Sequence, residues 1–371
     1  MGRQCAPADL IMTPASRRPA SPPRPLSTVS LFVPCYNYGR YLSDCVESVL
    51  GQEGVALRVL VIDDGSTDDS AAVAAALRAR DPRVEVLRHA RNQGVVNTYN
   101  KGLEWATGDY TMLLDADDIL TPGALGRSCA FLEAHPEAGF VYGRPLVIRE
   151  AGLPRLPRAR LRWRVWPGGE WIERRCRTGE NCVSQPTVVA RTDVLRRLGG
   201  YRTELPHSGD FEFWLRLAAH AAVGYIGGPY QAYYRDHADG LHRRLFGDPL
   251  TDLVQVKAAF DALFRHQGAH LRDRARLEPM ANRTVARRAL WAVCRALDGR
   301  QPAADLAGLE RFAVETWPDA SLLDEWRGVR WRRRLGSRIC PYLWPLLLFA
   351  TPSRIGPAIG RRIERWRRFE T

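Results

Sequence analysis

Three carboxylates close together in the sequence are the residues best suited to chemistry. Asp115, Asp117 and Asp118 directly follow the apolar run 112–114. Acids this close repel one another unless a cation compensates them, and oxygen-rich carboxylate sites suit Mg²⁺ or Mn²⁺, often shared with substrate phosphates. A divalent ion there would also neutralise charge on a departing diphosphate. The spacing therefore predicts a metal site, although short acidic patterns also arise by chance.

Two further polar clusters lie where strands are expected to end. Asn37 follows the apolar, β-branched run 28–34, and Asp63 and Asp64 follow the similar run 57–62. Ligands of parallel α/β sheets bind outside the carboxyl ends of the strands, so these clusters and the three acids are expected to converge. Turn and N-cap preferences of Asp, Ser and Gly offer an alternative, which explains one cluster more readily than all three.

The elements that must position these residues alternate between strand and helix. Apolar residues within 40–50 fall on one helical face. The alternation predicts an α/β fold with a mainly parallel sheet. Strand patterns lie at 28–34, 57–62, 83–87 and 110–114, and helical patterns lie at 40–50, 68–80 and 95–105.

Length and composition exclude some classes of protein. The chain has 371 residues, 45% hydrophobic and 26% charged, which excludes a fibrous or wholly disordered protein. Its net charge of +13 suits nucleic acid, an anionic membrane or phosphorylated substrates, without choosing among them. Eight cysteines show no CxxC pair and no metal-binding spacing, and the N-terminus lacks the apolar run of a secretory signal. We therefore expect unpaired thiols in a reducing cytoplasm.

Beyond these patterns, the region 28–240 resembles glycosyltransferase family 2. The matching segments are VSLFVPCYNYGRYLSDCVESVLGQ, VLVIDDGSTDDS, LLDADD, LGGYRTELPHSGDFEFWLRLA and YYRDHADG. The resemblance implies the GT-A fold, a Rossmann-like and mainly parallel sheet with flanking helices. It also implies transfer of a sugar from a nucleotide-diphosphate sugar, usually with inversion at the anomeric carbon.

The resemblance also assigns donor-binding roles. Pro34 and Tyr36 would pack around the nucleobase, Asp64 would hydrogen-bond the base, and Asp63 would help to shape the same pocket. The nucleotide stays open, because Tyr99 stands where many family members carry an arginine near it.

Metal and diphosphate-sugar binding would fall to the acids already noted. Asp117 and Asp118 match the paired acids of the family's metal motif, and Asp115 is the acid that often precedes them. The sequence does not apportion ribose, sugar and metal among them. His237 aligns with a position that contacts metal or diphosphate in some relatives, or else it is a polar surface residue. The implied cofactor is Mn²⁺ or Mg²⁺.

Asp210 matches the catalytic base of the family. An inverting displacement needs a carboxylate to take the proton of the acceptor hydroxyl. The commoner family pattern reads Glu-Asp, whereas this chain has Gly209 before Asp210, which leaves Glu212 as a competitor for the role. The two acids share a face if the stretch is extended and diverge if it is helical.

Two segments between the donor motifs and Asp210 bear on the acceptor. The stretch 180–186 precedes a strand-like run at 187–190 and lies in a region that lines the acceptor side in such enzymes. The stretch 153–175 is rich in Arg and Trp. It suggests a mobile loop over the acceptor or a solvated basic surface.

The chain divides into four expected parts. Residues 1–26 form a disordered lead-in, 27–245 the GT-A domain, 246–325 a helical extension and 326–371 a basic tail. The tail holds twelve arginines, two glutamates and four tryptophans. Its apolar run at 339–350 is too short for a spanning helix, which needs about 20 residues. An element lying in an anionic membrane interface fits it, and a partner-protein face and a solvated tail are the alternatives.

The function predicted from the sequence is inverting, metal-dependent sugar transfer to a glycan, lipid-linked or other hydroxyl acceptor. It would serve cell-surface polysaccharide or glycoconjugate biosynthesis, in the cytoplasm and at the inner face of the plasma membrane. The alternatives are an inactive scaffold, a nucleotidyltransferase, and a nucleic-acid-binding protein that uses the Arg/Trp tail. The acidic clusters have no role in the last of these, so no nucleic acid is expected as a partner.

Overall fold

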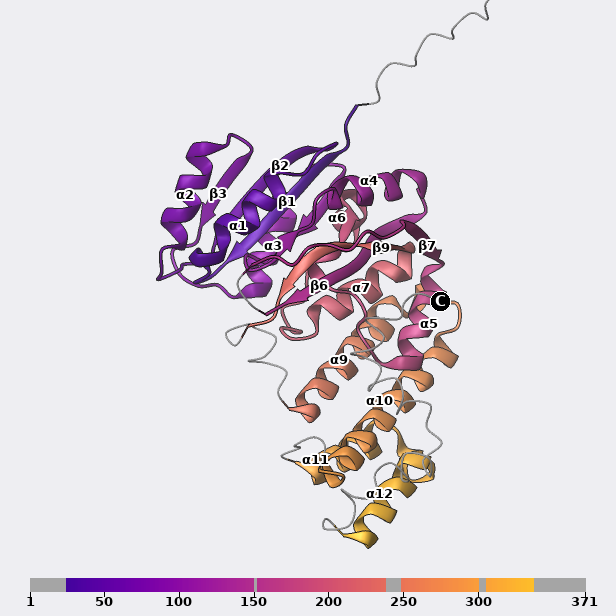
Figure 1. The fold of residues 1–371 in the computed structure, drawn as a ribbon. Coiled ribbons are helices and arrows are strands. Elements are labelled where there is room, and N and C mark those ends of the chain that lie inside the picture. The colour runs from indigo at the N-terminus through magenta and orange to yellow at the C-terminus, as the bar shows by residue number, and fades with distance from the viewer. Residues whose placement is uncertain (1–24, 150–151, 238–247, 300–304, 337–371) are drawn as a thin grey trace, which may run out of the picture.

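The structure is a computed structural model that describes residues 25–149, 152–237, 248–299 and 305–336. It contains one mixed sheet with helices on both faces, and a group of C-terminal helices that packs on the helices covering one of those faces (Figure 1). The expected lead-in, up to residue 24, and most of the expected tail, from residue 337, lie outside the described residues.

The sheet is parallel in its N-terminal half and mixed beyond it. The order is β3-β2-β1-β4-β8-β6-β9-β5, with β7 paired to β9. The first four strands are parallel, and β8 enters antiparallel to both β4 and β6. In the described part of the chain the strands are β1 (Thr28–Cys35), β2 (Ala56–Asp63), β3 (Val84–Arg88), β4 (Tyr110–Leu113), β5 (Ile119–Leu120), β6 (Ala138–Ile148), β7 (Arg162–Trp166), β8 (Val189–Arg191) and β9 (Ala222–Arg235).

Helices follow the strands and then continue alone. The longer helices are α1 (Gly39–Leu50), α2 (Ser70–Arg80), α3 (Val95–Trp105), α4 (Ala124–Ala134), α5 (Gly168–Thr178), α6 (Thr192–Leu198), α7 (Gly209–His220), α9 (Pro249–Gln267), α10 (Arg274–Leu297), α11 (Leu306–Thr316) and α12 (Asp324–Leu335). Short 3₁₀ turns occupy Gln185–Thr187, Gly268–His270 and Pro318–Leu322.

Strand β1 explains why the central strands read as nearly continuous apolar runs. Leu31 and Val33 belong to a core shared with α1, α2 and α4. Phe32, on the opposite side of the strand, belongs to a second core with residues of α5, α6 and α7. A sheet buried on both faces needs apolar side chains in both directions, as the sequence pattern of 28–34 indicated.

The predicted elements from 28 to 114 are present within two residues at each end. Two later expectations are wrong in detail. Residues 185–187 form a 3₁₀ turn before β8, and the stretch 153–175 is not simply a loop, because it contains β7 and most of α5. The helix forms because Trp171, Ile172 and Cys176 lie on one face and are fully buried in the core.

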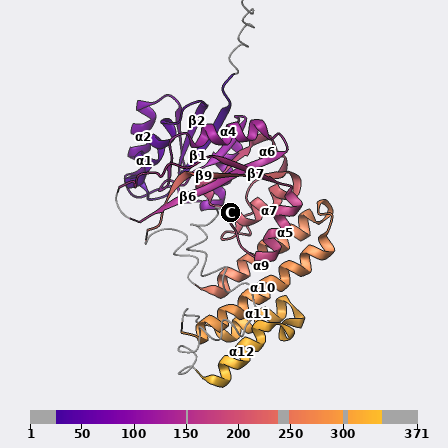
Figure 2. The ribbon, with the colours of Figure 1, turned by 45° about the vertical axis from the view of Figure 1, so that its right-hand side comes forward.

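The C-terminal helices pack around α10, and α9 joins them to α7 (Figures 1 and 2). Phe260 of α9 meets Phe211 of α7 edge-on, with 5.3 Å between ring centroids. The start of the predicted tail at 326 falls inside α12, where the buried Arg332 forms a double hydrogen bond with Asp298. In the described residues, no helix is both long and apolar enough to cross a membrane.

Candidate active site

The loops after β1 and β2 are fastened to each other at the carboxyl edge of the sheet. Asn37 adopts a left-handed conformation, with φ of 60°, and its Oδ1 accepts a hydrogen bond from the Thr67 backbone N–H at 2.8 Å. Gly65 also has a positive φ and packs so closely on the backbone of Arg91 and Asn92 that a Cβ would clash. This edge therefore has a closely packed backbone with little freedom to rearrange.

Asp64 is buried and held by the loop that follows β3. Its carboxylate accepts the backbone N–H groups of Gln93 and Gly94 at 2.9 and 3.1 Å, and it lies 2.7 Å from His89 Nδ1. The neighbouring Asp63 is fully buried, accepts the Ser66 N–H at 3.0 Å and forms an ion pair with Arg88 at 3.0 Å. Both acids support the loops around the predicted nucleobase pocket, and their contact with a base stays a prediction.

The other two predicted donor residues lie at the end of β1. Pro34 is partly buried within the strand, and Tyr36 is 43% exposed just beyond it. An exposed aromatic ring beside closely packed loops leaves a flat surface on which a base could stack. The sequence-predicted role of both residues is compatible with this position and is not tested by it.

The acids of the motif at 115–118 meet the C-terminal end of β9. Asp118 is buried, and its Oδ1 accepts the Arg235 N–H at 3.0 Å. Asp117 Oδ2 lies 2.9 Å from His237 Nε2. The structure thus brings together Asp117, Asp118 and His237, which are far apart in the sequence.

This arrangement fits a shared metal site better than a protein-only cage. No three His, Cys, Asp or Glu side chains in the described ranges are grouped to enclose an ion. Mg²⁺ commonly takes one or two carboxylates and completes its shell with phosphates and water, and Asp117 and Asp118 offer two such donors at the end of β9. Asp118 Oδ2 is buried without a hydrogen-bond partner among the described residues. Burial, with the charges of Asp117 and Asp115, raises the pKa of Asp118 well above its usual range. A bound cation would reduce the repulsion among these carboxylates.

A second group forms around two tyrosines, and we call it the carboxylate–tyrosine cluster: Asp115, Asp210, Tyr99 and Tyr201. The Tyr99 hydroxyl donates to Asp115 Oδ1 at 2.9 Å, and the Tyr99 and Tyr201 rings meet edge-on at 5.2 Å. Burial and the charges of Asp117 and Asp210 raise the pKa of Asp115 to about 7. Burial raises the pKa of Asp210 to about 6. The predicted base and the first predicted donor acid therefore lie close enough to influence each other.

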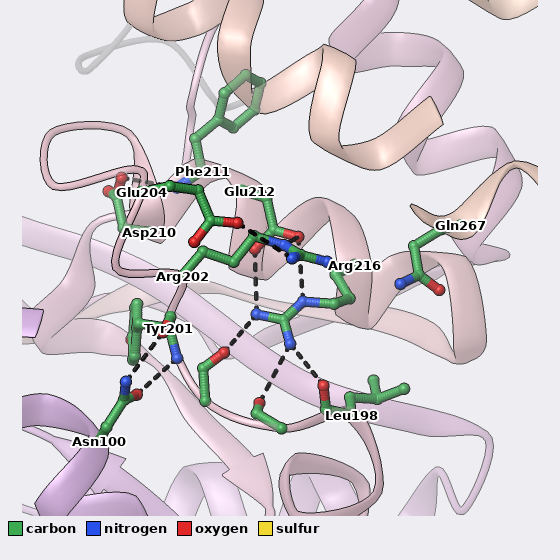
Figure 3. A network of polar contacts seen from close by, with 12 residues as sticks. Asn100, Leu198, Tyr201, Arg202, Glu204, Asp210, Phe211, Glu212, Arg216 and Gln267 are labelled. Atoms are coloured by element: carbon green, nitrogen blue, oxygen red, sulfur yellow. Dashed lines mark hydrogen bonds and ion pairs between the residues drawn. The ribbon is translucent and has the colours of Figure 1, made fainter. Parts of the chain in front are cut away.

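Asp210 and Glu212 point in different directions, because the stretch is the first turn of α7 (Figure 3). Glu212 is fully buried, and its carboxylate accepts hydrogen bonds from Arg202 at 3.1 Å and from Arg216 at 3.1 Å through both oxygens. Asp210 instead accepts the Asn181 amide at 2.8 Å and its neighbour's backbone N–H at 2.6 Å. Neutral donors leave Asp210 able to take a proton, whereas two arginines neutralise Glu212.

Arg216 also fixes the loop that carries Tyr201. Its guanidinium donates to the carbonyls of Leu198, Gly199 and Gly200 (Figure 3). Asn100 of α3 completes the attachment, since its side chain exchanges two hydrogen bonds with the Tyr201 backbone. The clamp around Glu212, formed by Arg202 and Arg216, therefore holds α3, the 198–201 loop and α7 in one arrangement. These contacts give Arg216 a structural role.

Several functional candidates carried little signal in the sequence. In the sequence, Tyr99 is marked only by its departure from the family pattern, and that departure does not predict its hydrogen bond to Asp115. Asn181 and Gln185 lie in the stretch assigned to the acceptor side, where Asn181 binds Asp210 and Gln185 accepts the Tyr201 hydroxyl at 3.3 Å. His89 belongs to no motif in the sequence that would predict its contact with Asp64. Its role depends on the fold, which places β3 beside β2.

A polar groove of about 510 Å³ lies between the end of β3 and α3. It is lined by Leu87, Arg88, His89, Gln93, Asn97, Asn100, Lys101 and Glu104. None of the predicted site residues lines it, although His89 and Gln93 also hold Asp64. It is thus a neighbour of the predicted base pocket.

Comparison with known proteins gives this geometry a family context. The family model described as Glycosyl transferase family 2 matches residues 30–199. An uncharacterized protein of Mycobacterium tuberculosis is 32% identical over 227 residues, which is 58% of this chain and 69% of that protein. Glycosyltransferase GlyG of Streptococcus pneumoniae is 39% identical over 92 residues, 25% of this chain and 31% of its own length.

Solved structures extend the comparison beyond the matched region. The structure of S. aureus TarS 1–349 in complex with UDP-GlcNAc has a TM-score of 0.57 and 18% sequence identity. The match covers 89% of this chain and 88% of that one. At this identity the likeness concerns the fold alone, and its coverage takes in the C-terminal helices as well as the sheet.

Proposed function

The chain belongs to glycosyltransferase family 2, and on that premise we propose that it transfers a sugar with inversion, using Asp210 as the base. The family, its GT-A fold with a C-terminal helical part, and glycosyltransferase activity were all expected from the sequence and are confirmed. Transfer from a nucleotide-diphosphate sugar follows from the family. The inverting chemistry, the metal and the acceptor are our proposals.

One observation supports the base assignment above the others. Asp210 lies in a cluster with Asp115, and within the described part of the chain its carboxylate accepts hydrogen bonds from neutral donors alone. In the proposed reaction the acceptor oxygen bonds to the anomeric carbon as the bond to the diphosphate oxygen breaks. Asp210 takes the acceptor proton, and a pKa raised by burial to about 6 suits a base that works near neutral pH. Glu212 is excluded from this role by its two arginines.

We assign the donor to the loops at the carboxyl edge of the sheet. Pro34, Tyr36, Asp63 and Asp64 would form the nucleobase pocket, and Asp115 with Asp117 would bind the ribose or diphosphate sugar. The solved structural relative TarS carries UDP-GlcNAc in one complex and UDP in another, which supports a nucleotide-sugar donor without choosing its base.

Asp117, Asp118 and His237 would hold Mn²⁺ or Mg²⁺. When bound, the ion would supply positive charge to the leaving diphosphate. The chain's own contribution is orientation, because Arg235 anchors Asp118 through its backbone N–H and reaches the Asp117 carbonyl with its side chain.

A thermal-shift panel tests the donor and metal assignments together. Nucleoside diphosphates and their sugars would be added with and without Mn²⁺, since a ligand that binds the native state raises its apparent stability. We expect a shift with one nucleotide that increases with Mn²⁺, and Asp118→Asn should lose the metal-dependent part. If no nucleotide shifts the folded protein, the enzyme assignment of these residues is wrong and a scaffold takes its place.

We also propose that the end of the chain associates with an anionic membrane, as its Arg, Trp and apolar content suggests. A truncation to test this should begin at 337 and leave α12 intact, because Arg332 of that helix is buried against Asp298. The shortened protein should no longer partition onto vesicles containing anionic lipid, and its donor-induced thermal shift should persist. Unchanged partitioning would contradict the proposal.

A further inference from the structure

Five exposed arginines lie together on residues 153–164, which we call the arginine segment. They are Arg155, Arg158, Arg160, Arg162 and Arg164. None of them forms an ion pair with any residue in the described ranges. No Asp or Glu occurs between 151 and 169. Like charges at this density repel one another, so the segment presents a positive potential that an anionic ligand would relieve.

The neighbouring strands add no compensating charge. Strands β6, β7 and β9 contain no Asp or Glu, and they contribute Arg144 and Arg235. β7 is paired with β9 alone among the described strands, so its outer side is an edge (Figure 1). These three strands thus carry no carboxylate of their own, and at the end of β9 the first acid, Asp236, is paired with Arg149.

The arginine segment starts near that end of β9 and runs back along the strand. The Tyr233 hydroxyl donates to the Pro154 carbonyl at 3.0 Å. The Arg160 carbonyl then packs directly against Gly228, where a side chain would clash, and the segment continues into β7, where Arg164 pairs with Tyr225. From Tyr233 to Tyr225, at about 3.3 Å per residue, the path is about 26 Å long.

We propose that the arginine segment binds an anionic acceptor, a glycan chain that carries phosphate or carboxylate groups along its length. This rests on the proposed function, because it names the acceptor class for the same site. A chain lying on the segment would have one end beside Asp117 and Asp118 and its acidic groups against the arginines. The path is long enough to contact several charged units at once.

The geometry favours an extended polymer over a flat lipid surface. Side chains of an extended strand alternate between two faces, so Arg162 and Arg164 project from one side of β7 and Trp163 from the other. Trp163 is 41% exposed, but its ring meets Phe131 edge-on at 5.4 Å between centroids, which holds it against α4. A membrane contact would need the arginines and the apolar side chains of the segment to face the same flat surface, whereas here Arg162 and Arg164 face away from Trp163.

Binding assays with defined polymers test the proposal without any transfer reaction. The full-length protein would be titrated with polygalacturonate, inorganic polyphosphate and neutral dextran. The variant Arg155→Gln/Arg158→Gln/Arg160→Gln removes three charges outside the β7 ladder. The control Arg78→Gln/Arg265→Gln/Arg311→Gln removes three exposed charges from α2, α9 and α11. Vesicles with anionic lipid form a further arm.

We expect at least one acidic polymer to bind, dextran not to bind, and the segment variant to lose about tenfold in affinity at low salt while the control changes little. Equal losses in both variants would reduce the effect to net charge and overturn the proposal. Wild-type affinity in the segment variant would also overturn it. If the segment is needed for vesicles and not for polymers, it is a membrane contact. The nucleotide-induced thermal shift is read separately in each variant, so a failure of the donor site is distinguishable.

Discussion

Acids with little exposure fall into two groups in this molecule, those of the structural ion pairs and those of the predicted active site, and the two groups meet different partners. In one group each acid meets arginine: Glu212 meets Arg202 and Arg216, Glu325 meets Arg287, Asp298 meets Arg332, and Asp63 at the end of β2 meets Arg88. In the other group, around the predicted active site, the half-buried Asp115 and Asp210 and the buried Asp118 are held by tyrosine, amide and backbone donors. The first arrangement joins elements together, and the second leaves charge to be completed by a ligand.

This contrast separates structural from functional carboxylates more clearly than burial does. Glu212 and Asp118 are both almost wholly buried. A buried acid with a bidentate arginine is neutralised and fixed in place. A buried acid beside other acids has a raised pKa and favours a cation or a proton. Carboxylates with a raised pKa cluster at functional sites, and in this chain they coincide with the family's motifs.

The largest effect should come from removing the proposed base. Asp210→Asn should lower the release of nucleoside diphosphate, from the donor identified by thermal shift, by about 10²–10⁴-fold. The donor affinity of the variant, measured by thermal shift, should stay within a few-fold of the wild-type affinity, because Asp210 acts on the acceptor. Turnover near the wild-type rate would show that another group takes the proton.

Breaking the clamp should instead appear in stability. Glu212→Gln leaves two arginines without their carboxylate, and loss of one partner from a buried pair costs about 3–5 kcal/mol. Urea denaturation measures this as a lower free energy of unfolding. Glu204→Gln is the matched control, because Glu204 meets Arg202 at the exposed surface and should change little. Equal stability of the two variants would mean that the clamp has no structural role.

Asp210 should lower stability where Glu212 raises it. Its folded pKa of about 6 lies above its ordinary value of 3.8, so the folded state binds the proton more tightly than the unfolded state. The contribution of Asp210 to wild-type stability should therefore fall as pH rises from about 4 to about 6. Asp210→Asn should melt a few degrees higher than the wild type at pH 7.5, and the difference should disappear near pH 4. Melting curves of both proteins between pH 4 and pH 7.5 test this prediction. A difference in melting temperature that does not change with pH would show that the raised pKa of Asp210 is not its cause.

The smallest effect should come from the Tyr99 hydroxyl. Tyr99→Phe removes one hydrogen bond to Asp115 and leaves the ring contact with Tyr201, so about 1 kcal/mol is at stake. We expect a loss of a few-fold in kcat/KM for the donor and little change in melting temperature. Tyr201→Phe, which removes a hydroxyl bonded to Gln185 instead, serves as the comparison. A larger loss in Tyr201→Phe would place the more important hydroxyl on the acceptor side.

Much of the catalytic region was predictable because its information is local. Apolar runs followed by polar residues mark strands that end at a binding edge, and Asp63, Asp64, Asp115, Asp117 and Asp118 lie where that pattern placed them. Since parallel strands bring their carboxyl ends to one side, sequence order was enough to group these residues. Family motifs added Asp210 and His237, whose roles stay predictions.

What the tertiary structure alone decided is which partner each side chain meets. Asp210 and Glu212 are both acids of one motif, and the helix separates them by turning Glu212 toward Arg202 and Arg216 and Asp210 toward Asn181, which is 29 residues away in the chain. Tyr99 contacts Asp115 because the fold sets α3 against the acids after β4, and the arginines of 153–164 lie in a row because their segment runs beside β9. Periodicity and motif spacing are set by neighbours in the chain, whereas charge pairing depends on residues that only packing brings together.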